Sequence, residues 1–237
     1  MLLAEKYRDR LFGFLKSRAV GQRGELFTEA SRERPSSAPR SGDDLGARFC
    51  SELNAVGGEA ADLAASADPA AELGSWLQGL GLKTAVIDSD PSWELTGLPM
   101  REIVEGAGLE LERVDASALP AELSEVDLGI TLADAAIAET GTIAQCARPF
   151  RPRSISLVPR CHLVLVPRDR LLASLEDLFE GISSGAEWTG GPEGFASYFT
   201  WMTGPSRTAD IEKTLTSGVH GPARAGAFLL AAEPRDD

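Results

Sequence analysis

The sequence predicts an α/β protein built on an open, mostly parallel β-sheet. Short runs rich in Ile, Leu and Val alternate along the chain with segments whose apolar residues recur at helical spacing. The composition agrees, because 237 residues with 43% hydrophobic and 25% charged side chains are typical of a globular protein that buries a sizeable core. In such sheets, ligands bind beyond the carboxyl ends of the strands, where the strand order reverses.

The first 46 residues differ from the rest. Residues 1–20 are predicted to form an amphipathic helix, which could pack on the body of the protein or on a second copy. Its apolar positions are Leu3, Tyr7, Leu11, Phe14 and Leu15. Residues 21–46 are rich in Pro, Ser, Gly and charge with little to bury, so we expect a mobile arm or linker there. The main domain is expected to cover residues 47–237.

The first half of this domain contains helices with one apolar side and strands that end at turns. We expect helices at Asp43–Val56, Pro69–Gly79 and Met100–Ala107. We expect strands at Lys83–Ile87 and Leu109–Val114. The apolar sides of the first two helices are Phe49, Leu53 and Val56, and Leu73, Trp76 and Leu77. The first strand ends in the turn-rich sequence Asp-Ser-Asp-Pro.

The second half is richer in strands. Four runs of Ile, Leu and Val are predicted strands: Asp127–Leu132, Thr142–Ala147, Ser154–Val158 and His162–Val166. Helical spacing then extends from Leu171 to Ile182, a further helix is expected at Thr208–Ser217, and Ala227–Ala231 is a final apolar strand.

The charge of the chain is unevenly distributed. It carries 36 acidic against 23 basic side chains, a net charge of -13 that repels phosphate backbones and anionic lipid. We therefore expect no nucleic-acid partner and no binding to membrane surfaces. From Thr140 to Arg168, however, there is no Asp or Glu and the charge is purely basic. The arginines there are Arg148, Arg151, Arg153, Arg160 and Arg168. This pattern predicts either an anionic ligand or an acidic protein surface as their partner.

The cysteines and the start of the chain point to a reducing compartment. Cys50, Cys146 and Cys161 are odd in number and not in paired spacing, which argues against disulfides. Without a CxxC motif, the chain by itself does not supply the usual thiolates of an iron–sulfur cluster or a structural zinc site. Charge appears within the first residues, and no run approaches the roughly 20 apolar residues of a membrane span. We expect a cytoplasmic protein.

The sequence Ala-Glu-Thr-Gly-Thr at residues 138–142 is the first candidate for chemistry. Glu139 lies between small residues, and Gly141 permits a tight turn that would present the carboxylate at a sheet edge. Next to an arginine-rich stretch, such a carboxylate could act as a base, a nucleophile or an ion-pair partner. The alternative is that Glu139 caps a turn and pairs with Arg153.

The segment Thr203–Glu212 is the second candidate. Thr208 could cap a helix after the Gly204-Pro205 turn, so that the hydroxyls of Ser206 and Thr208 and the guanidinium of Arg207 would hold a phosphate or carboxylate at the helix N-terminus. Acidic side chains in the first helical turn, Asp210 and Glu212, already satisfy the helix dipole. An ordinary, well-capped helix is therefore the alternative.

The two histidines of the chain are the third candidate for chemistry. His220 lies in the tight Gly-Val-His-Gly-Pro sequence at residues 218–222, and His162 begins an apolar strand. A solvated loop histidine and a satisfied core histidine are the ordinary alternatives to a catalytic role. A metal site made of both histidines and Glu139 is conceivable, but nothing in the spacing demands it, so no metal is predicted.

Together these segments resemble the lactate utilization protein C family, also called the LUD domain. The residues that match lie at 129–142, where Ala133-Asp-Ala-Ala-Ile-Ala leads to the Glu139 motif, and at Arg153–Pro159, His162, Thr203–Glu212 and Gly218–Pro222. Two positions depart from the family pattern: Pro152 replaces the usual glycine before Arg153, and Cys161 replaces the usual apolar residue before His162.

The resemblance implies a three-layer α/β/α fold of the sugar-phosphate isomerase and CoA-transferase type. It also implies a role in oxidising L-lactate to pyruvate together with two iron–sulfur partner proteins, which would carry the clusters, so that this chain needs no cofactor of its own. By analogy with the CoA transferases, whose nucleophile is a glutamate near a glycine, Glu139 could be a nucleophile.

The expected site is a pocket for a small anionic ligand, a carboxylate or a phosphate. The expected catalytic residues are Glu139, His220 and His162. The expected ligand-binding residues are Thr140, Gly141, Thr142, Arg153, Gly204, Ser206, Arg207, Thr208 and Asp210. Two alternatives remain open: a non-catalytic scaffold subunit that uses the arginines to dock an acidic partner, and a sugar-phosphate or CoA-thioester enzyme that uses Glu139.

Overall fold

The computed structural model describes residues 44–115, 117, 120–184, 198–209, 215–218 and 220–232, all of which belong to one compact unit of the chain. The predicted helix at residues 1–20 and nearly all of the predicted linker at 21–46 lie outside these ranges. The first described helix, α2 (Leu45–Ala55), begins within two residues of the predicted start, where the Asp44 carboxylate accepts hydrogen bonds from the backbone N–H groups of Gly46 and Ala47.

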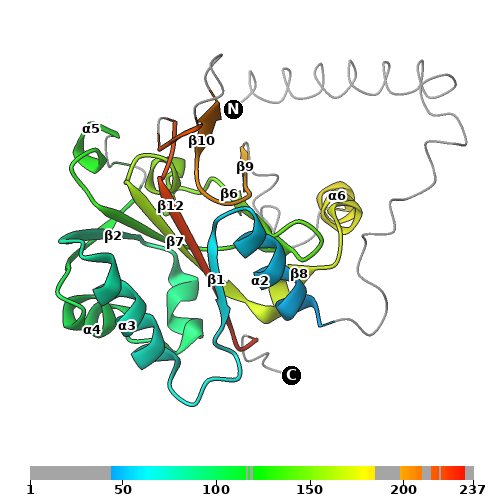
Figure 1. Cartoon of the computed structure of the whole chain (residues 1–237), viewed down its shortest axis with the longest axis horizontal. Helices are drawn as coiled ribbons and strands as arrows, with labels where there is room; N and C mark the ends of the chain where they lie inside the picture. The colour runs from blue at the N-terminus through cyan, green and yellow to red at the C-terminus, as the bar shows by residue number, and fades with distance from the viewer. Residues whose placement is uncertain are drawn as a thin grey trace, which may run out of the picture. The chain divides into compact units, whose positions relative to one another are not determined.

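Six parallel strands form the central sheet (Figure 1). Their order across the sheet is β1 (Glu59–Asp62), β12 (Arg224–Leu230), β7 (Cys161–Pro167), β4 (Leu128–Leu132), β2 (Thr84–Asp88) and β3 (Glu110–Val114). Every neighbouring pair is parallel, which confirms the predicted sheet. From β2 the chain moves outward to β3 and then returns on the other side of β2, so the strand order reverses between β2 and β4.

Helices cover one face of this sheet, and a helix with a second, smaller sheet covers the other. On the first face, Leu163 and Leu165 of β7 share a core with α3 (Pro69–Leu80) and α4 (Met100–Gly106). On the second face, Val164 and Val166 pack with Phe49 and Leu53 of α2. Figure 1 shows α3 and α4 on one side of the sheet and α2 on the other, which confirms the predicted three-layer α/β architecture.

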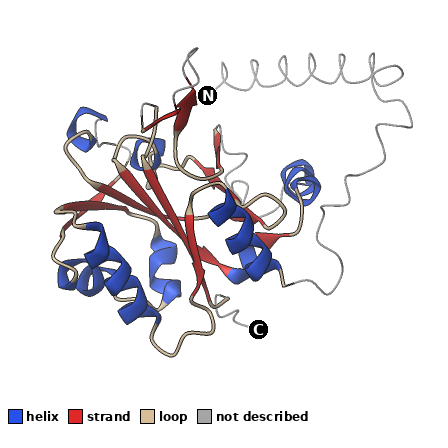
Figure 2. Ribbon diagram, in the orientation of Figure 1, coloured by secondary structure: helices blue, strands red, loops and turns tan. Residues whose placement is uncertain are grey.

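The smaller sheet has the strand order β8 (Leu171–Leu172), β5 (Ala135–Ile137), β6 (Thr142–Cys146) and β9 (Phe199–Met202). Every residue of β5 and β6 is buried. The helix α6 (Leu175–Ser184) packs on it through Leu178. Figure 2 shows the helices in blue and the strands of both sheets in red. The strands β1, β5 and β9 are not predicted by the sequence pattern, because they have only three or four residues each.

Two predicted elements are wrong. Ser154–Val158 is not a strand, because after Pro152 the chain forms a 3-10 helix at Arg153–Ser156, whose Ile155 is buried against Val86 and Leu123. The predicted helix Thr208–Ser217 is also absent from its described parts, β10 (Arg207–Ala209) and β11 (Leu215–Ser217), which pair as antiparallel strands. Threonines at 208 and 216 lie opposite each other in this pairing, and β-branched residues favour strands.

The remaining short elements complete the connections. They are the 3-10 helices Pro91–Thr96 and Arg168–Arg170 and the helix α5 (Pro120–Leu123). The predicted helix from Leu171 to Ile182 is divided between β8 and α6. Within the described ranges, every helix is too short or too polar to span a lipid bilayer.

Candidate functional site

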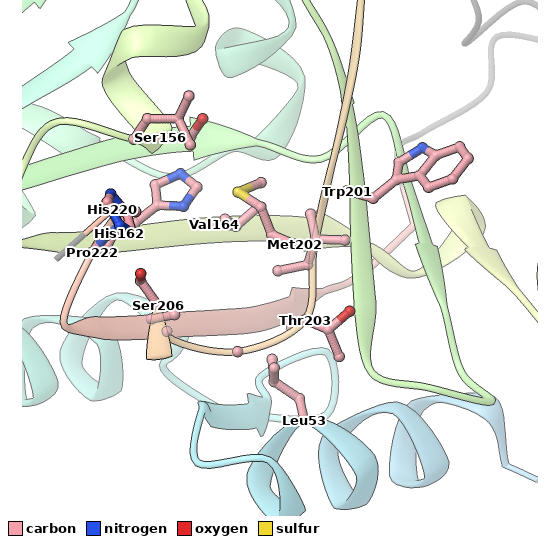
Figure 3. A pocket seen from close by; sticks show the side chains of 16 residues that line it. Leu53, Ser156, His162, Val164, Trp201, Met202, Thr203, Ser206, His220 and Pro222 are labelled. Carbon is pink, nitrogen blue, oxygen red and sulfur yellow. The ribbon is translucent and has the colours of Figure 1, made fainter. Parts of the chain in front are cut away.

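A cavity of about 200 Å³ lies between the two sheets, at the amino ends of β7 and β12 (Figure 3). Its walls come from both sheets, the end of α2 and two loops. The lining residues are Leu53, Ile143, Ser156, Leu157, His162, Val164, Trp201, Met202, Thr203, Gly204, Ser206, His220, Gly221, Pro222, Ala225 and Gly226. It thus lies at the ends opposite to the carboxyl ends of the strands, where we expected a ligand to bind.

His162 enters this cavity because of its place in β7. Alternation along the strand directs Leu163 and Leu165 to the α3 side, and His162 and Val164 to the α2 side. The imidazole is only 2% exposed, and its Nε2 lies 2.8 Å from the hydroxyl of Thr131 on β4. Burial lowers the pKa of His162 to about 3. The ring is therefore neutral at neutral pH.

His220 reaches the same cavity from an exposed loop (Figure 3). Backbone hydrogen bonds fix this loop against the segment before β10: Ser206 N–H donates to Pro222 O at 2.8 Å, and Gly218 N–H donates to Ser206 O at 3.0 Å. Gly218 has a φ of 80°, which glycine adopts without strain. Two histidines that are distant in sequence thus line one cavity, together with the predicted residues Ser206 and Gly204.

The threonines of the Glu139 motif lie behind the cavity wall. The hydroxyl of Thr142 is 2.6 Å from that of Thr140 and 2.7 Å from that of Thr203, which lines the cavity. Gly141 has a φ of 63°, and a Cβ on it would lie 2.4 Å from the backbone nitrogen of Leu53. Only glycine allows this turn to pack so closely on α2.

Three predicted site residues point elsewhere. The backbone N–H of Leu175 donates to Glu139 Oε2 at 3.4 Å, so the carboxylate lies at the start of α6. Glu139 does not pair with Arg153, whose guanidinium carbon lies 4.8 Å from the ring centre of Tyr198. The guanidinium of Arg207 donates to the carbonyl oxygen of Val56 at the end of α2. None of the three is among the lining residues.

The second motif contains no described helix N-terminus to hold an anion. Arg207 and Thr208 begin strand β10, so Thr208 does not cap a helix in the way we predicted. Asp210 lies outside the described residues, as does the side chain of Thr208. The backbone N–H of Ser206 already donates to Pro222 O.

The arginine-rich stretch is largely neutralised by acids from other parts of the chain. Arg151 is 3% exposed and contacts Asp88, Asp90 and Asp134. Arg148 Nη2 lies 3.2 Å from Asp134 Oδ1, and Arg168 Nη2 lies 2.6 Å from Asp62 Oδ2. These arginines therefore do not form one exposed basic surface.

The buried cluster around Arg151 occupies the place where we expected a ligand. Asp88 ends β2 and Asp134 follows β4, and the strand order reverses between these two strands. The guanidinium Nε lies 3.1 Å from Asp88 Oδ2, Nη1 lies 2.5 Å from Asp134 Oδ2, and Nη2 contacts Asp90. In the sequence, Asp88 and Asp90 indicate only a turn, so the pattern does not predict this cluster.

The carboxylates of the cluster differ in their pKa values. Burial raises the pKa of Asp88 to about 6, and Arg151 opposes this shift without cancelling it. Burial also acts on Asp90, but there Arg151 and the N–H of Ser92 outweigh it, so the pKa of Asp90 is lowered.

Asp88→Asn should therefore change the pH dependence of stability. A carboxyl whose pKa is raised in the folded state favours folding most at low pH, and this contribution is lost as pH rises from about 4 to 6. Between those limits, the free energy of unfolding of the wild type should fall relative to the variant by up to about 3 kcal/mol. Urea unfolding at several pH values measures the difference, and a constant difference would show that the Asp88 pKa is not raised.

The cysteines are protonated thiols. Burial raises the pKa of Cys50 and Cys161 to about 11 and that of Cys146 to about 12. Among the described residues, no three His, Cys, Asp or Glu side chains are grouped as ligands of one metal ion.

Comparison with known proteins agrees with the resemblance seen in the sequence. The family described as "LUD domain" matches residues 51–230. A "Lactate utilization protein C" from Exiguobacterium is 39% identical over 105 residues, 44% of each chain. Another from Halalkalibacterium halodurans is 30% identical over 152 residues, 63% of each chain. The chain thus spans about half the length of the curated relatives it matches.

A solved structure shows the same fold. It is a crystal structure of a DUF162 family protein from Deinococcus radiodurans, with a TM-score of 0.53 and 23% identity. The match covers 78% of this chain and 96% of the other.

Proposed function

This chain belongs to the LUD domain family, and from that premise we propose that it is a component of an L-lactate utilization system, with the cavity between its two sheets as the ligand site. The names of the relatives, lactate utilization protein C, support a role in lactate utilization. The observation that carries the site is the meeting of both histidines of the chain, His162 and His220, in one cavity.

We propose the oxidation of L-lactate to pyruvate as the reaction, in a cytoplasmic complex. This step releases two electrons and two protons, and the electrons need an acceptor. The three cysteines of this chain, Cys50, Cys146 and Cys161, lack the spacing of cluster ligands, which supports placing the iron–sulfur clusters in two partner proteins. The share of this chain is then to bind the acid, orient it and accept the hydroxyl proton, while the two electrons and the proton from C2 leave to the partner proteins and the solvent.

The cavity suits a small 2-hydroxy or 2-oxo acid. Its volume of about 200 Å³ is below the range typical of sites for drug-sized ligands. Val164, Met202 and Leu53 provide an apolar wall for a methyl group, and Ser206 and Thr203 provide hydroxyls for a carboxylate. His162, neutral and buried, serves as a hydrogen-bond donor, so the exposed His220 is the residue that accepts the hydroxyl proton.

The two alternative functions, a non-catalytic scaffold subunit and a sugar-phosphate or CoA-thioester enzyme, have weaker support. A phosphate or CoA ligand carries more negative charge than a monocarboxylate, and the described residues that line the cavity include no Lys or Arg to balance it. The scaffold function is favoured by one surface observation: Phe179 and Trp201 are 49% and 47% exposed, with ring centres 5.5 Å apart. Such a pair is a suitable contact for a partner protein and is compatible with a ligand site.

Filling the cavity tests the proposed ligand site. Ala225 of β12 lines the cavity, so Ala225→Leu places a larger side chain in it. We expect the variant to keep its fold and to lose binding of L-lactate and pyruvate by calorimetry. Cells that carry it in place of the wild type should not grow on L-lactate. Normal growth of cells with a folded Ala225→Leu variant would contradict the proposal.

Glu139→Gln distinguishes this site from the one expected by analogy with CoA transferases. Because the Glu139 carboxylate lies at the start of α6, we expect the variant to oxidise L-lactate at a rate within about threefold of the wild type, a change of well under 1 kcal/mol. Arg153→Ala, at a second predicted residue outside the cavity lining, is the matched control for Glu139→Gln. Loss of activity in Glu139→Gln alone, or an acyl adduct on Glu139 by mass spectrometry after exposure to acyl-CoA, would favour the transferase function.

A further inference from the structure

A buried chain of polar side chains leads from the backbone of β4 to His162. Gln145 Nε2 on β6 lies 2.8 Å from the carbonyl oxygen of Leu132 and 2.6 Å from Thr131 Oγ1. Thr131 Oγ1 in turn lies 2.8 Å from His162 Nε2. All three side chains are buried, at 4% exposure or less. The protein itself therefore sets the order of donors and acceptors in this chain.

The direction of each hydrogen bond follows from its far end. A backbone carbonyl oxygen only accepts, so the amide group of Gln145 that faces Leu132 must be its NH₂. The second N–H of that NH₂ then donates to Thr131 Oγ1. Thr131 accepts there, and among the described residues His162 Nε2 is the only acceptor within reach of its hydroxyl proton, so Thr131 donates to Nε2. A ring nitrogen that accepts a hydrogen bond carries no proton, so in the neutral ring the proton is on Nδ1.

The other ring nitrogen faces the cavity. The ring of His162 lines the cavity, with Ser156 on one side and Met202 across from it (Figure 3). Among the described residues, no group forms a hydrogen bond with Nδ1. In the described part of the chain, the side-chain polar atoms that are fully buried and have no hydrogen-bond partner are Arg48 Nε and Arg168 Nε. Nδ1 is not one of them, so it is open to the cavity. A ligand in the cavity is thus the natural acceptor for the Nδ1 proton.

We infer that Thr131 and Gln145 are positioning residues, which hold His162 as the tautomer with its proton on Nδ1 so that the cavity offers its ligand a fixed hydrogen-bond donor. The ligand must then present an acceptor at this point, such as a carboxylate, carbonyl or hydroxyl oxygen. That the ligand occupies this cavity rests on the proposed function, whereas the tautomer can be measured on the protein alone.

NMR of the imidazole nitrogens in the full chain tests the tautomer. The chain has only two histidines, so a His220→Ala variant assigns the signals of His162. From about pH 5 to pH 8, the range in which histidines normally titrate, we expect a protonated Nδ1 and an unprotonated Nε2 that do not change. A proton on Nε2, or a titration of His162 in this range, would overturn the inference whatever the ligand proves to be.

Variants of the two positioning residues test the cause. In Thr131→Val, the hydroxyl that donates to Nε2 is gone, so the single tautomer should be lost, while Thr131→Ser should retain it. Gln145→Glu supplies an acceptor in place of a donor, which should reverse the chain and move the proton to Nε2. Thr142→Val, which removes a hydroxyl bonded to Thr203 instead, is the matched control. Identical spectra for Thr131→Val and Thr142→Val would show that Thr131 does not position His162.

Titration with sodium L-lactate and sodium pyruvate tests the ligand. We expect either acid to shift the Nδ1 signal of His162, and Thr131→Val to weaken binding by roughly five- to tenfold, the effect of one hydrogen bond. If neither acid binds but the tautomer is as inferred, the proposed function fails and the role of Thr131 and Gln145 stands. If both bind without shifting Nδ1, the donor role of His162 is wrong.

Discussion

Replacing His220 with alanine is expected to reduce L-lactate oxidation by the proposed complex by about 10²- to 10⁴-fold, the usual contribution of a group that accepts or donates a proton in the transition state. His220 is the exposed histidine of the cavity, and His162 cannot replace it, because burial lowers the pKa of His162 to about 3. Since the His220 side chain is exposed, its removal should leave the fold unchanged. Steady-state rates with the partner proteins measure the effect.

Arg224→Ala is a suitable control for His220→Ala. Arg224 is a neighbouring exposed residue whose guanidinium forms a surface ion pair with Glu59, 2.7 Å apart, and such pairs contribute little to stability. Its replacement should leave the rate unchanged. A His220→Ala variant with normal rate would show that this cavity does not carry the proton transfer. If its rate is low but it no longer assembles with the partners, the scaffold function would be favoured.

Replacing Arg151 with methionine is expected to lower the free energy of unfolding by about 3 to 5 kcal/mol, the cost of breaking a buried ion pair by removing one partner. Three carboxylates, Asp88, Asp90 and Asp134, would then lie together without the cation that neutralises them. The loss should be smaller near pH 5 than at pH 8, because carboxylates left without Arg151 bind protons in the folded state more readily than in the unfolded state.

Arg101→Met is the matched control for Arg151→Met. Arg101 forms an exposed i,i+4 pair with Glu105 on α4, and its side chain is 54% exposed. The same chemical change there should cost about 0.5 kcal/mol or less. Urea unfolding of both variants decides between a structural cluster and an incidental one. If Arg151→Met costs no more than Arg101→Met, the cluster does not stabilise the sheet.

The central sheet could be predicted from the sequence because its strands are apolar throughout. In β7, every residue from Cys161 to Pro167 is buried, so the run of Leu and Val is continuous and visible without any partner strand. The apolar residues at 154–158 gave the same signal, but only because Ile155 fills a small core next to a 3-10 helix. An apolar residue indicates burial, and it does not show which backbone conformation is buried.

The candidate site was predictable only in part. His162, His220, Ser206 and Gly204 belong to the predicted set and line the cavity. Glu139 does not, although it is three positions from Thr142. The tight turn at Gly141 separates the two, so that Thr142 contacts Thr203 while Glu139 lies at the start of α6. Thr131 and Gln145 were missed because their role depends on three strands that meet in space.

The sequence by itself determined the fold class, the family and the residues able to carry chemistry, because apolar periodicity and motifs are local properties of the chain. The tertiary structure decided where the charges go. The stretch from Thr140 to Arg168 is purely basic as a sequence, yet Arg151 lies among three aspartates from other segments. A buried guanidinium needs counter-charges within a few ångströms, and only the folded sheet brings them there. The place where the strand order reverses is thereby filled with charge, and the histidine cavity forms at the opposite ends of the strands.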